Sequence, residues 1–241
     1  MRVSLDLLPP AALHENDVAI VVDVLRMTTT ATVLAELGLA RLSVVADVER
    51  ARERARSDGA LLLGERDARP LPGFDGGNSP LEYTGVAVQG RAAVLCTTNG
   101  SSAVEACAGA RHVLLGSLRN AHAVAQRTLA LASDHVLLVC AGTEGALSLD
   151  DVVAAGRIVA ALQTARPDAA LDDAALLARE AARGDLETLL ASSRHGRTLV
   201  RAGFAGDLAE AARLDITDVV LERLGRSTDT FRVGRARPDV Q

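Results

Sequence analysis

The run Val18–Val22 constrains the fold most, because five successive apolar residues are typical of a strand buried on both faces of a sheet. Asp23 and Arg26 follow it, and an Ala/Leu-rich helical pattern comes next over Thr30–Leu37. In open α/β sheets, ligands bind outside the carboxyl ends of the strands. The two charged residues are therefore predicted to belong to a site. The alternative is a surface ion pair between them, with a threonine capping the helix.

Strand and helix patterns alternate along most of the chain, which predicts a mostly parallel or mixed sheet with helices on both faces. Further apolar strands are predicted at Leu42–Ala46, Leu61–Leu63, Ala92–Cys96, Val113–Leu115 and Val136–Cys140. From Asp172 the pattern is helical until a last strand at Val219–Leu221. The expected fold is thus a three-layer α/β/α arrangement with a helical C-terminal part. One domain over residues 1–241 is predicted, with two subdomains meeting near 150–170 as the alternative.

Charge and residue usage exclude several classes of protein. The net charge is −5 and no basic tract stands out, so no nucleic-acid partner is expected. The three cysteines form no C-x-x-C motif and the histidines no H-x-x-x-H motif, which argues against disulfides and zinc. No apolar run is long enough for a bilayer, so a cytoplasmic protein without a membrane partner is expected. Since aromatic residues make up only 2% of the chain, the core must consist of Ala, Val and Leu.

Carboxylates follow several of the predicted strands. Asp23, Glu65, Asp75 and Asp150 are candidate ligands for a hard cation such as Mg²⁺, which prefers oxygen. Taken singly, each could instead be a solvated surface carboxylate or a helix cap. Because the carboxyl ends of parallel strands share one edge of a sheet, residues distant in sequence are expected to meet there.

The turn at Thr97–Ser101 is the most phosphate-like stretch. Asn99 and Gly100 tolerate positive φ, which lets successive N–H groups point at one anion, and the following helix adds its positive end. The stretch is not a Walker A loop, because that motif's spacing and lysine are absent. An ordinary N-capped turn is the alternative.

Several motifs together resemble the 2-phosphosulfolactate phosphatase family. Residues 23–30 read DVLRMTTT, where the family has D-V-L-R-A-T/S-T-T. Residues 64–66 (GER), 73–80 (GFDGGNSP), 97–101 (TTNGS), 140–142 (CAG) and 148–151 (SLDD) follow in the family's order. The likeness runs from about Val3 to Val220, and Asp150 stands where the family usually has Glu.

The resemblance implies a magnesium-dependent hydrolase that converts 2-phospho-3-sulfolactate into 3-sulfolactate and phosphate, a step of coenzyme M biosynthesis. Asp23, Arg26 and Glu65 are then the expected catalytic residues, and Asp23, Glu65, Asp75 and Asp150 the expected metal ligands. Planar arginine side chains suit phosphoryl and sulfonate oxygens. The expected substrate-binding residues are Arg66, Asn78, Ser79, Thr97, Thr98, Asn99, Gly100, Ser101 and Asn120.

Alternative functions stay open at this point. The phosphatase could act on another small anionic phosphate ester, or the chain could be a non-catalytic anion-binding module. An aspartyl-phosphate route like that of haloacid-dehalogenase phosphatases needs a second Asp two residues after Asp23, where Leu25 stands. A homodimer is left open.

Overall fold

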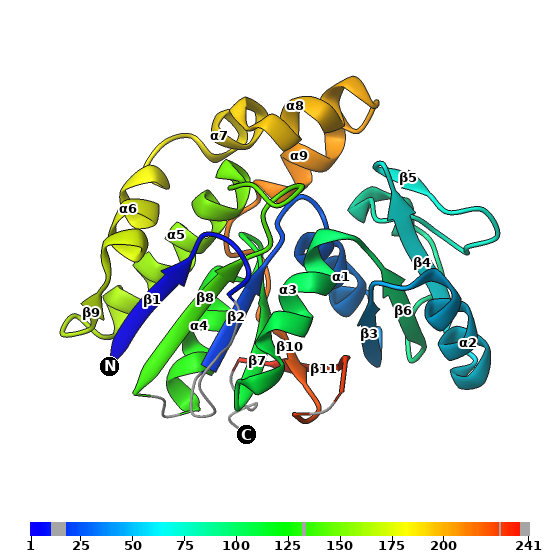
Figure 1. The fold of residues 1–241 in the computed structure, drawn as a ribbon, viewed down its shortest axis with the longest axis horizontal. Helices are drawn as coiled ribbons and strands as arrows, with labels where there is room; N and C mark the ends of the chain where they lie inside the picture. Colours follow the sequence, from blue (N-terminus) through cyan, green and yellow to red (C-terminus); the bar gives the residue numbers. More distant parts are fainter. Residues whose placement is uncertain (11–17, 132–133, 227, 237–241) are drawn as a thin grey trace.

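The computed structural model describes residues 1–10, 18–131, 134–226 and 228–236 (Figure 1). The strands are β1 Arg2–Asp6, β2 Val18–Val22, β3 Arg41–Val45, β4 Leu61–Arg66, β5 Arg69–Pro70, β6 Ala92–Cys96, β7 His112–Gly116, β8 His135–Cys140, β9 Ala170–Leu171, β10 Val219–Arg223 and β11 Thr230–Arg235. The helices are α1 Met27–Glu36, α2 Val48–Asp58, α3 Asn99–Ala106, α4 Ala121–Ala130, α5 Leu149–Ala165, α6 Asp173–Ala181, α7 Leu186–Ser192, α8 Arg194–Arg201 and α9 Ala205–Ala211. The expected α/β class is confirmed.

The strands form one mixed sheet in the order β5-β4-β6-β3-β11-β10-β7-β2-β8-β1-β9. Within it, β7, β2, β8 and β1 form one parallel block, and β3, β6 and β4 form a second. The two blocks are joined through β10 and β11, which pair antiparallel with each other and with their neighbours β7 and β3. No sequence pattern predicted β11.

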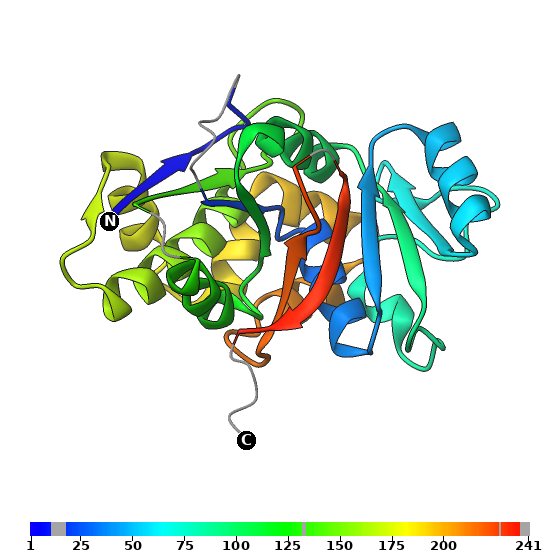
Figure 2. The same cartoon turned by 90° about the horizontal axis from the view of Figure 1, so that it is seen from below.

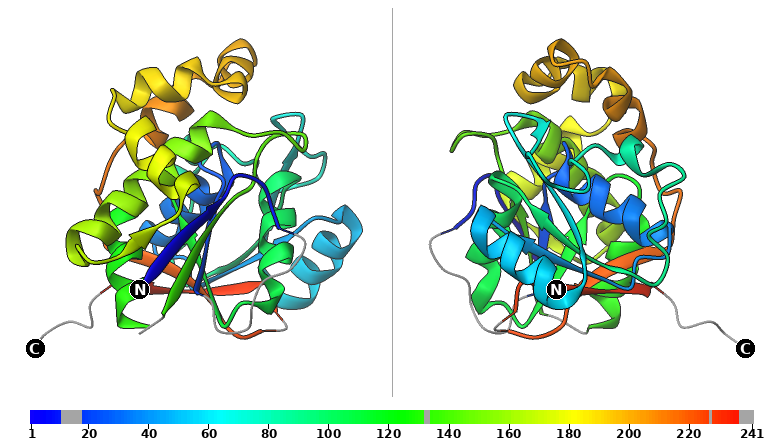
Figure 3. Two further views of the ribbon diagram at one scale, coloured as in Figure 1. Left: turned by 60° about the vertical axis from the view of Figure 1, so that its left-hand side comes forward. Right: turned by 90° about the vertical axis from the view of Figure 1, so that its right-hand side faces the viewer.

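Helices cover both faces of this sheet. On one face α4, α5 and α6 pack against the sheet, and α7 to α9 pack against α5 and one another, in an aliphatic core that includes Ile20, Leu138 and Ile158. On the other face α1 and α3 pack through residues such as Leu34 and Val104. On β3 and β6, α2 covers the face opposite to α1 and α3, where Val45 and Val94 belong to a separate small core. Figure 3 shows α7 to α9 as a tier beyond one end of the sheet. As the composition requires, this core consists chiefly of Ala, Val and Leu.

Twist decides where the strand ends lie. Counted through the antiparallel pairs, the second block runs opposite to the first, so in a flat sheet their carboxyl ends would lie on opposite edges. Strands twist relative to their neighbours, and the twist accumulates across a sheet. Figure 2 shows the strands of the second block at a steep angle to those of the first. The carboxyl ends of β2, β4, β6 and β8 consequently all reach one pocket.

Local signals placed most boundaries correctly. The predicted strand at Val18–Val22 is β2 without change. Asp47, an acidic residue just before α2, caps that helix by accepting a hydrogen bond from the Arg50 N–H at 2.7 Å. The first helix begins earlier than predicted, at Met27. No threonine side chain caps this helix. The Thr29 hydroxyl donates instead to the Val24 carbonyl, and the Thr30 hydroxyl donates to the Asn78 carbonyl. Among the described residues, no helix is long and apolar enough to cross a bilayer.

Candidate active site

A pocket of about 320 Å³ lies where the carboxyl ends of the two strand blocks meet. Seven of the predicted site residues line it: Asp23, Arg26, Glu65, Asn78, Thr97, Thr98 and Asn99. Leu25, Asp67 and Ala68 also line it, and the loop after β8 and the N-terminal part of α8 contribute Thr143, Glu144, Arg194, His195 and Thr198. Figure 1 shows α8 and α9 beyond the end of β2 that carries Asp23.

Asp23 is a buried carboxylate at the end of β2, with 7% of its surface exposed. Its Oδ1 accepts a 3.4 Å hydrogen bond from the Met27 N–H at the start of α1. Burial, and after it the nearby Glu65 carboxylate, raise the pKa of Asp23 to about 7. A carboxylate held in this way suits either cation binding or proton transfer near neutral pH.

Gly100 shows how closely α3 approaches this carboxylate. A Cβ on Gly100 would lie 2.5 Å from Asp23 Oδ2 and 2.6 Å from Met27 Cε. Asn99 and Gly100 do not use the positive φ that both tolerate, because they form the first helical residues of α3. The stretch therefore offers a helix N-terminus in place of a left-handed turn, and the glycine is needed for its missing side chain.

We expect Gly100→Ala to destabilise the protein by about 1–3 kcal/mol, because the added methyl group overpacks a buried contact. Alanine is otherwise the better helix former, so helix propensity opposes this loss. Gly225→Ala is the matched control, since a Cβ there meets nothing within 4 Å. Urea unfolding of both variants measures the difference, and equal stabilities would contradict the close packing of α3 on Asp23.

Arg26 is held by residues from two other segments, the turn after β4 and the start of α9. Its Nη1 donates to Asp207 Oδ2 at 2.8 Å, and its Nη2 donates to the Ala68 carbonyl at 2.8 Å. The guanidinium also lies 4.4 Å from the centre of the Phe204 ring. Ser79 fixes the other oxygen of Asp207 with a 2.6 Å hydrogen bond. Arg26 is thus a rigid, desolvated cation at the pocket wall, with N–H groups left for a ligand.

Two more carboxylates are buried behind the pocket. Asp151 accepts the N–H groups of Val24 and Gly142 at 2.9 and 3.0 Å, so it links the loops after β2 and β8. Burial, and then the neighbouring Asp150, raise the pKa of Asp151 well above its usual value. Asp150 accepts the Ser148 hydroxyl at 2.6 Å and lies 3.9 Å from His195 Nδ1.

Comparison with known proteins identifies the family of the chain. The sequence profile of the family described as 2-phosphosulpholactate phosphatase matches residues 5–224. The chain belongs to this phosphatase family. A probable 2-phosphosulfolactate phosphatase of Deinococcus radiodurans is 47% identical over 224 residues, covering 91% of this chain and 92% of the relative. Proteins with the same description from Carboxydothermus hydrogenoformans and Symbiobacterium thermophilum are 38% and 42% identical, covering 92% and 86% of this chain and 93% and 91% of theirs.

Three further residues predicted for the site of this phosphatase family member lie outside the pocket lining and make structural hydrogen bonds: Ser79, Ser101 and Asn120. Ser79 acts through Asp207, as described above, and the Ser101 hydroxyl donates to the Thr97 carbonyl at the start of α3. Asn120 is fully buried, where its Oδ1 accepts the Ser117 N–H and its Nδ2 donates to carbonyls of β7 and β10. Asn120 thus links two strands in the interior.

Arg66 and Asp75 lie outside the pocket lining. Successive residues of a strand point to opposite faces, so Arg66 cannot follow Glu65 into the pocket. Its guanidinium donates instead to the carbonyls of Ala46 and Glu65 at 2.6 and 2.8 Å. Asp75 Oδ2 accepts the Leu62 N–H at 2.8 Å and so ties the 67–80 loop to β4.

Three residues of this site were not predicted from the sequence: Arg194, His195 and Asp207. They come from the helical region after Asp172, where no strand end or motif spacing marks them. The sequence pattern bears on His195 only as a zinc ligand, and it argues against that role. In the structure its Nδ1 lies 3.4 Å from the Thr143 hydroxyl, and burial lowers its pKa despite the nearby Asp150.

The raised pKa of Asp23 predicts a pH-dependent stability in metal-free protein. Below about pH 4 the carboxyl is protonated in both states. As the pH rises toward 7, the unfolded chain releases the proton while the folded chain retains it, so stability is lost and the loss is complete above the folded pKa of about 7. An asparagine side chain at this position cannot ionise. We therefore expect the Tm of Asp23→Asn minus that of the wild type to increase between pH 5 and pH 8, and a constant difference would contradict the burial effect.

Proposed function

We propose that the protein is a magnesium-dependent phosphatase that hydrolyses 2-phospho-3-sulfolactate to 3-sulfolactate and phosphate. The observation that carries the proposal is a buried Asp23 beside Arg26 in a small pocket at which α1, α3 and α8 begin. Helix N-termini and a fixed arginine favour compact anions. The names of the relatives supply the substrate, and a cytoplasmic place in coenzyme M biosynthesis belongs to the same proposal.

The donor atoms in the pocket fit magnesium better than zinc. Among the described residues, no group of three or more His, Cys, Asp and Glu side chains is arranged around one metal position. Magnesium keeps several waters and needs few protein ligands, which are oxygen atoms. Asn78 Oδ1 is buried without a hydrogen-bond partner in the same pocket that Asp23 and Glu65 line. An unpaired buried oxygen beside two carboxylates favours a cation.

Asp23, Glu65 and Asn78 are the residues that would hold the ion. Asp75 points to β4, and Asp150 is engaged by Ser148 and lies beside His195, so neither belongs to this proposed set. When bound, magnesium supplies charge neutralisation at the phosphoryl oxygens.

The chain's own residues bind and orient the phosphate ester. Arg26 is fixed by Asp207, so little side-chain entropy is lost when it binds a phosphoryl oxygen. The N-terminus of α3 lies at the pocket, because Thr98 and Asn99, where the helix begins, line it. The positive end of the helix dipole therefore faces a bound anion. Phosphoryl transfer depends mainly on such positioning and on charge stabilisation. Leu25 lines the pocket two residues after Asp23, which favours attack by water over a phosphoaspartate route.

The decisive experiment is a phosphate-release assay with 2-phosphosulfolactate and Mg²⁺. We expect multiple turnovers and release of 3-sulfolactate. A small-anion binding module would bind the ester, detected by calorimetry, without releasing phosphate. Turnover of other small phosphate esters with no preference for 2-phosphosulfolactate would retain the phosphatase class and reject this substrate.

A further inference from the structure

The pocket contains two arginine side chains of opposite character. Arg26 is buried, with 3% of its side chain exposed, and its charge is compensated by Asp207. Arg194 lies at the mouth with 53% of its side chain exposed. Its ion pair with Glu144 is long, at 3.4 Å, and Glu144 is itself 80% exposed. Exposed pairs of this kind contribute little, so a ligand can recruit Arg194 readily.

The backbone places Arg194 for an anion. Arg194 is the first residue of α8, and the Ser193 side chain caps that helix by accepting the Gly196 N–H at 2.8 Å. Arg194 Nη2 donates to the Thr143 carbonyl at 2.6 Å, which directs the side chain along the loop after β8. The arginine charge and the positive end of α8 therefore act together on the same wall of the pocket.

In the proposed function, another part of the pocket lining binds the phosphoryl group. It is formed by Thr97, Thr98 and Asn99 at the start of α3, next to Asp23. A substrate with two strongly acidic groups fits two positive walls better than a simple monoester does.

We propose that Arg194, with the first turn of α8, binds the second strongly acidic group of the substrate and so determines specificity for it. This inference rests on the proposed function, in which that group is the sulfonate. Arg194 thus replaces Arg66 as the second arginine of the site, because the guanidinium of Arg66 is bound to backbone carbonyls outside the pocket lining.

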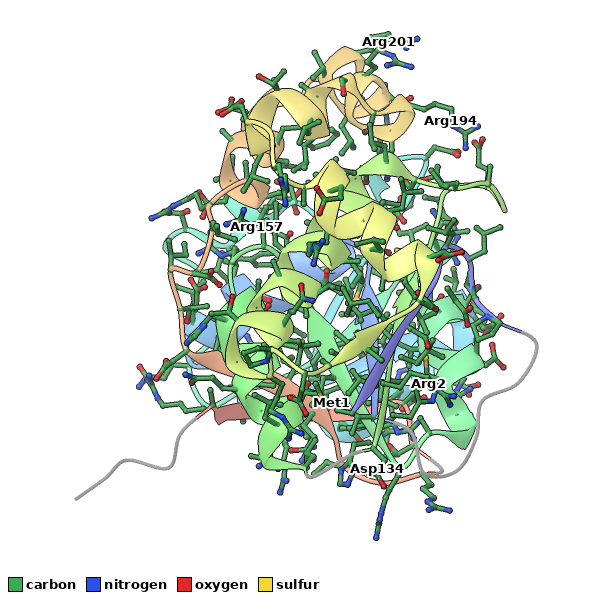
Figure 4. The ribbon with its side chains drawn as sticks, turned by 90° about the vertical axis from the view of Figure 1, so that its left-hand side faces the viewer. Met1, Arg2, Asp134, Arg157, Arg194 and Arg201 are labelled. Carbon is green, nitrogen blue, oxygen red and sulfur yellow. The ribbon has the colours of Figure 1, made fainter. Side chains whose placement is uncertain are left out.

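The test compares Arg194→Gln with the wild type on 2-phosphosulfolactate and on 2-phospholactate, which lacks the sulfonate. Loss of one charged hydrogen-bonding contact should lower kcat/KM for the sulfonated ester by about 10- to 100-fold and leave the plain ester nearly unchanged. Arg194→Lys should retain much of the preference. Arg201→Gln, at the exposed far end of the same helix, is the matched control and should change neither rate (Figure 4).

Equal losses on both esters, or no loss on either, would overturn the assignment. A wild-type protein that hydrolyses neither ester would refute the proposed function instead. In that case calorimetry still tests Arg194, with 3-sulfolactate and lactate as probes. Weaker binding of 3-sulfolactate alone by Arg194→Gln supports the inference, and unchanged binding overturns it.

Discussion

Asp23→Asn is expected to lower kcat/KM for 2-phosphosulfolactate by about 10³-fold, in the range found for groups that act directly on the reacting atoms. The substitution keeps the size of the side chain and removes its charge from the pocket where β2 ends. Folding should survive, because an ionised carboxylate buried in this position opposes stability. Steady-state phosphate release at saturating Mg²⁺ measures the effect.

Asp168→Asn provides the matched control. Asp168 has 72% of its side chain exposed. It lies close to β9, which pairs with the amino-terminal end of β1. Its replacement should leave activity unchanged. An Asp23→Asn enzyme with activity within about 10-fold of the wild type would exclude Asp23 from the chemistry.

Removal of divalent metal is the second change expected to have a large effect. Asp23 and Glu65 repel one another in a desolvated pocket, and a phosphate dianion adds to this repulsion. Without a cation we expect turnover to fall by more than about 100-fold, as several kcal/mol of charge stabilisation are lost. The assay follows dialysis against a chelator, and Mg²⁺ is then added back.

Recovery of activity on adding Mg²⁺ separates loss of the ion from loss of the fold. A sample dialysed against chelator with excess Mg²⁺ controls for other effects of the treatment. Undiminished turnover in the metal-free enzyme would show that Arg26 and the helix N-termini suffice, and the metal proposal would fail.

The helical region after Asp172 contributes more to the pocket than its sequence indicates. Asp207 orients Arg26, and α8 supplies Arg194 and His195. These residues belong to ordinary amphipathic or charged helices, in which nothing distinguishes a pocket-facing side chain from a solvated one. Their partners lie far away in the sequence, as the separation of 181 positions between Arg26 and Asp207 illustrates.

The sequence by itself determined the elements and the chemical character of the pocket. Apolar runs such as Val18–Val22 are long and uniform enough to specify buried strands, and Asp47 with Gly59 marks both ends of α2. Asp23, Glu65 and Thr97 were identifiable because polar residues directly after buried strands must lie at a sheet edge. These signals are local, so they act within a few residues of the position they specify.

Only the tertiary structure decided which strand ends meet and which charges face the pocket. The antiparallel β10 and β11 join two parallel blocks, and accumulated twist brings the carboxyl ends of both to one pocket. Because successive residues of a strand point to opposite faces, Glu65 lines the pocket while Arg66 donates to backbone carbonyls outside its lining. The return of the chain through α8 brings Arg194 to the pocket. Such contacts depend on packing between distant segments, which short-range sequence patterns do not encode.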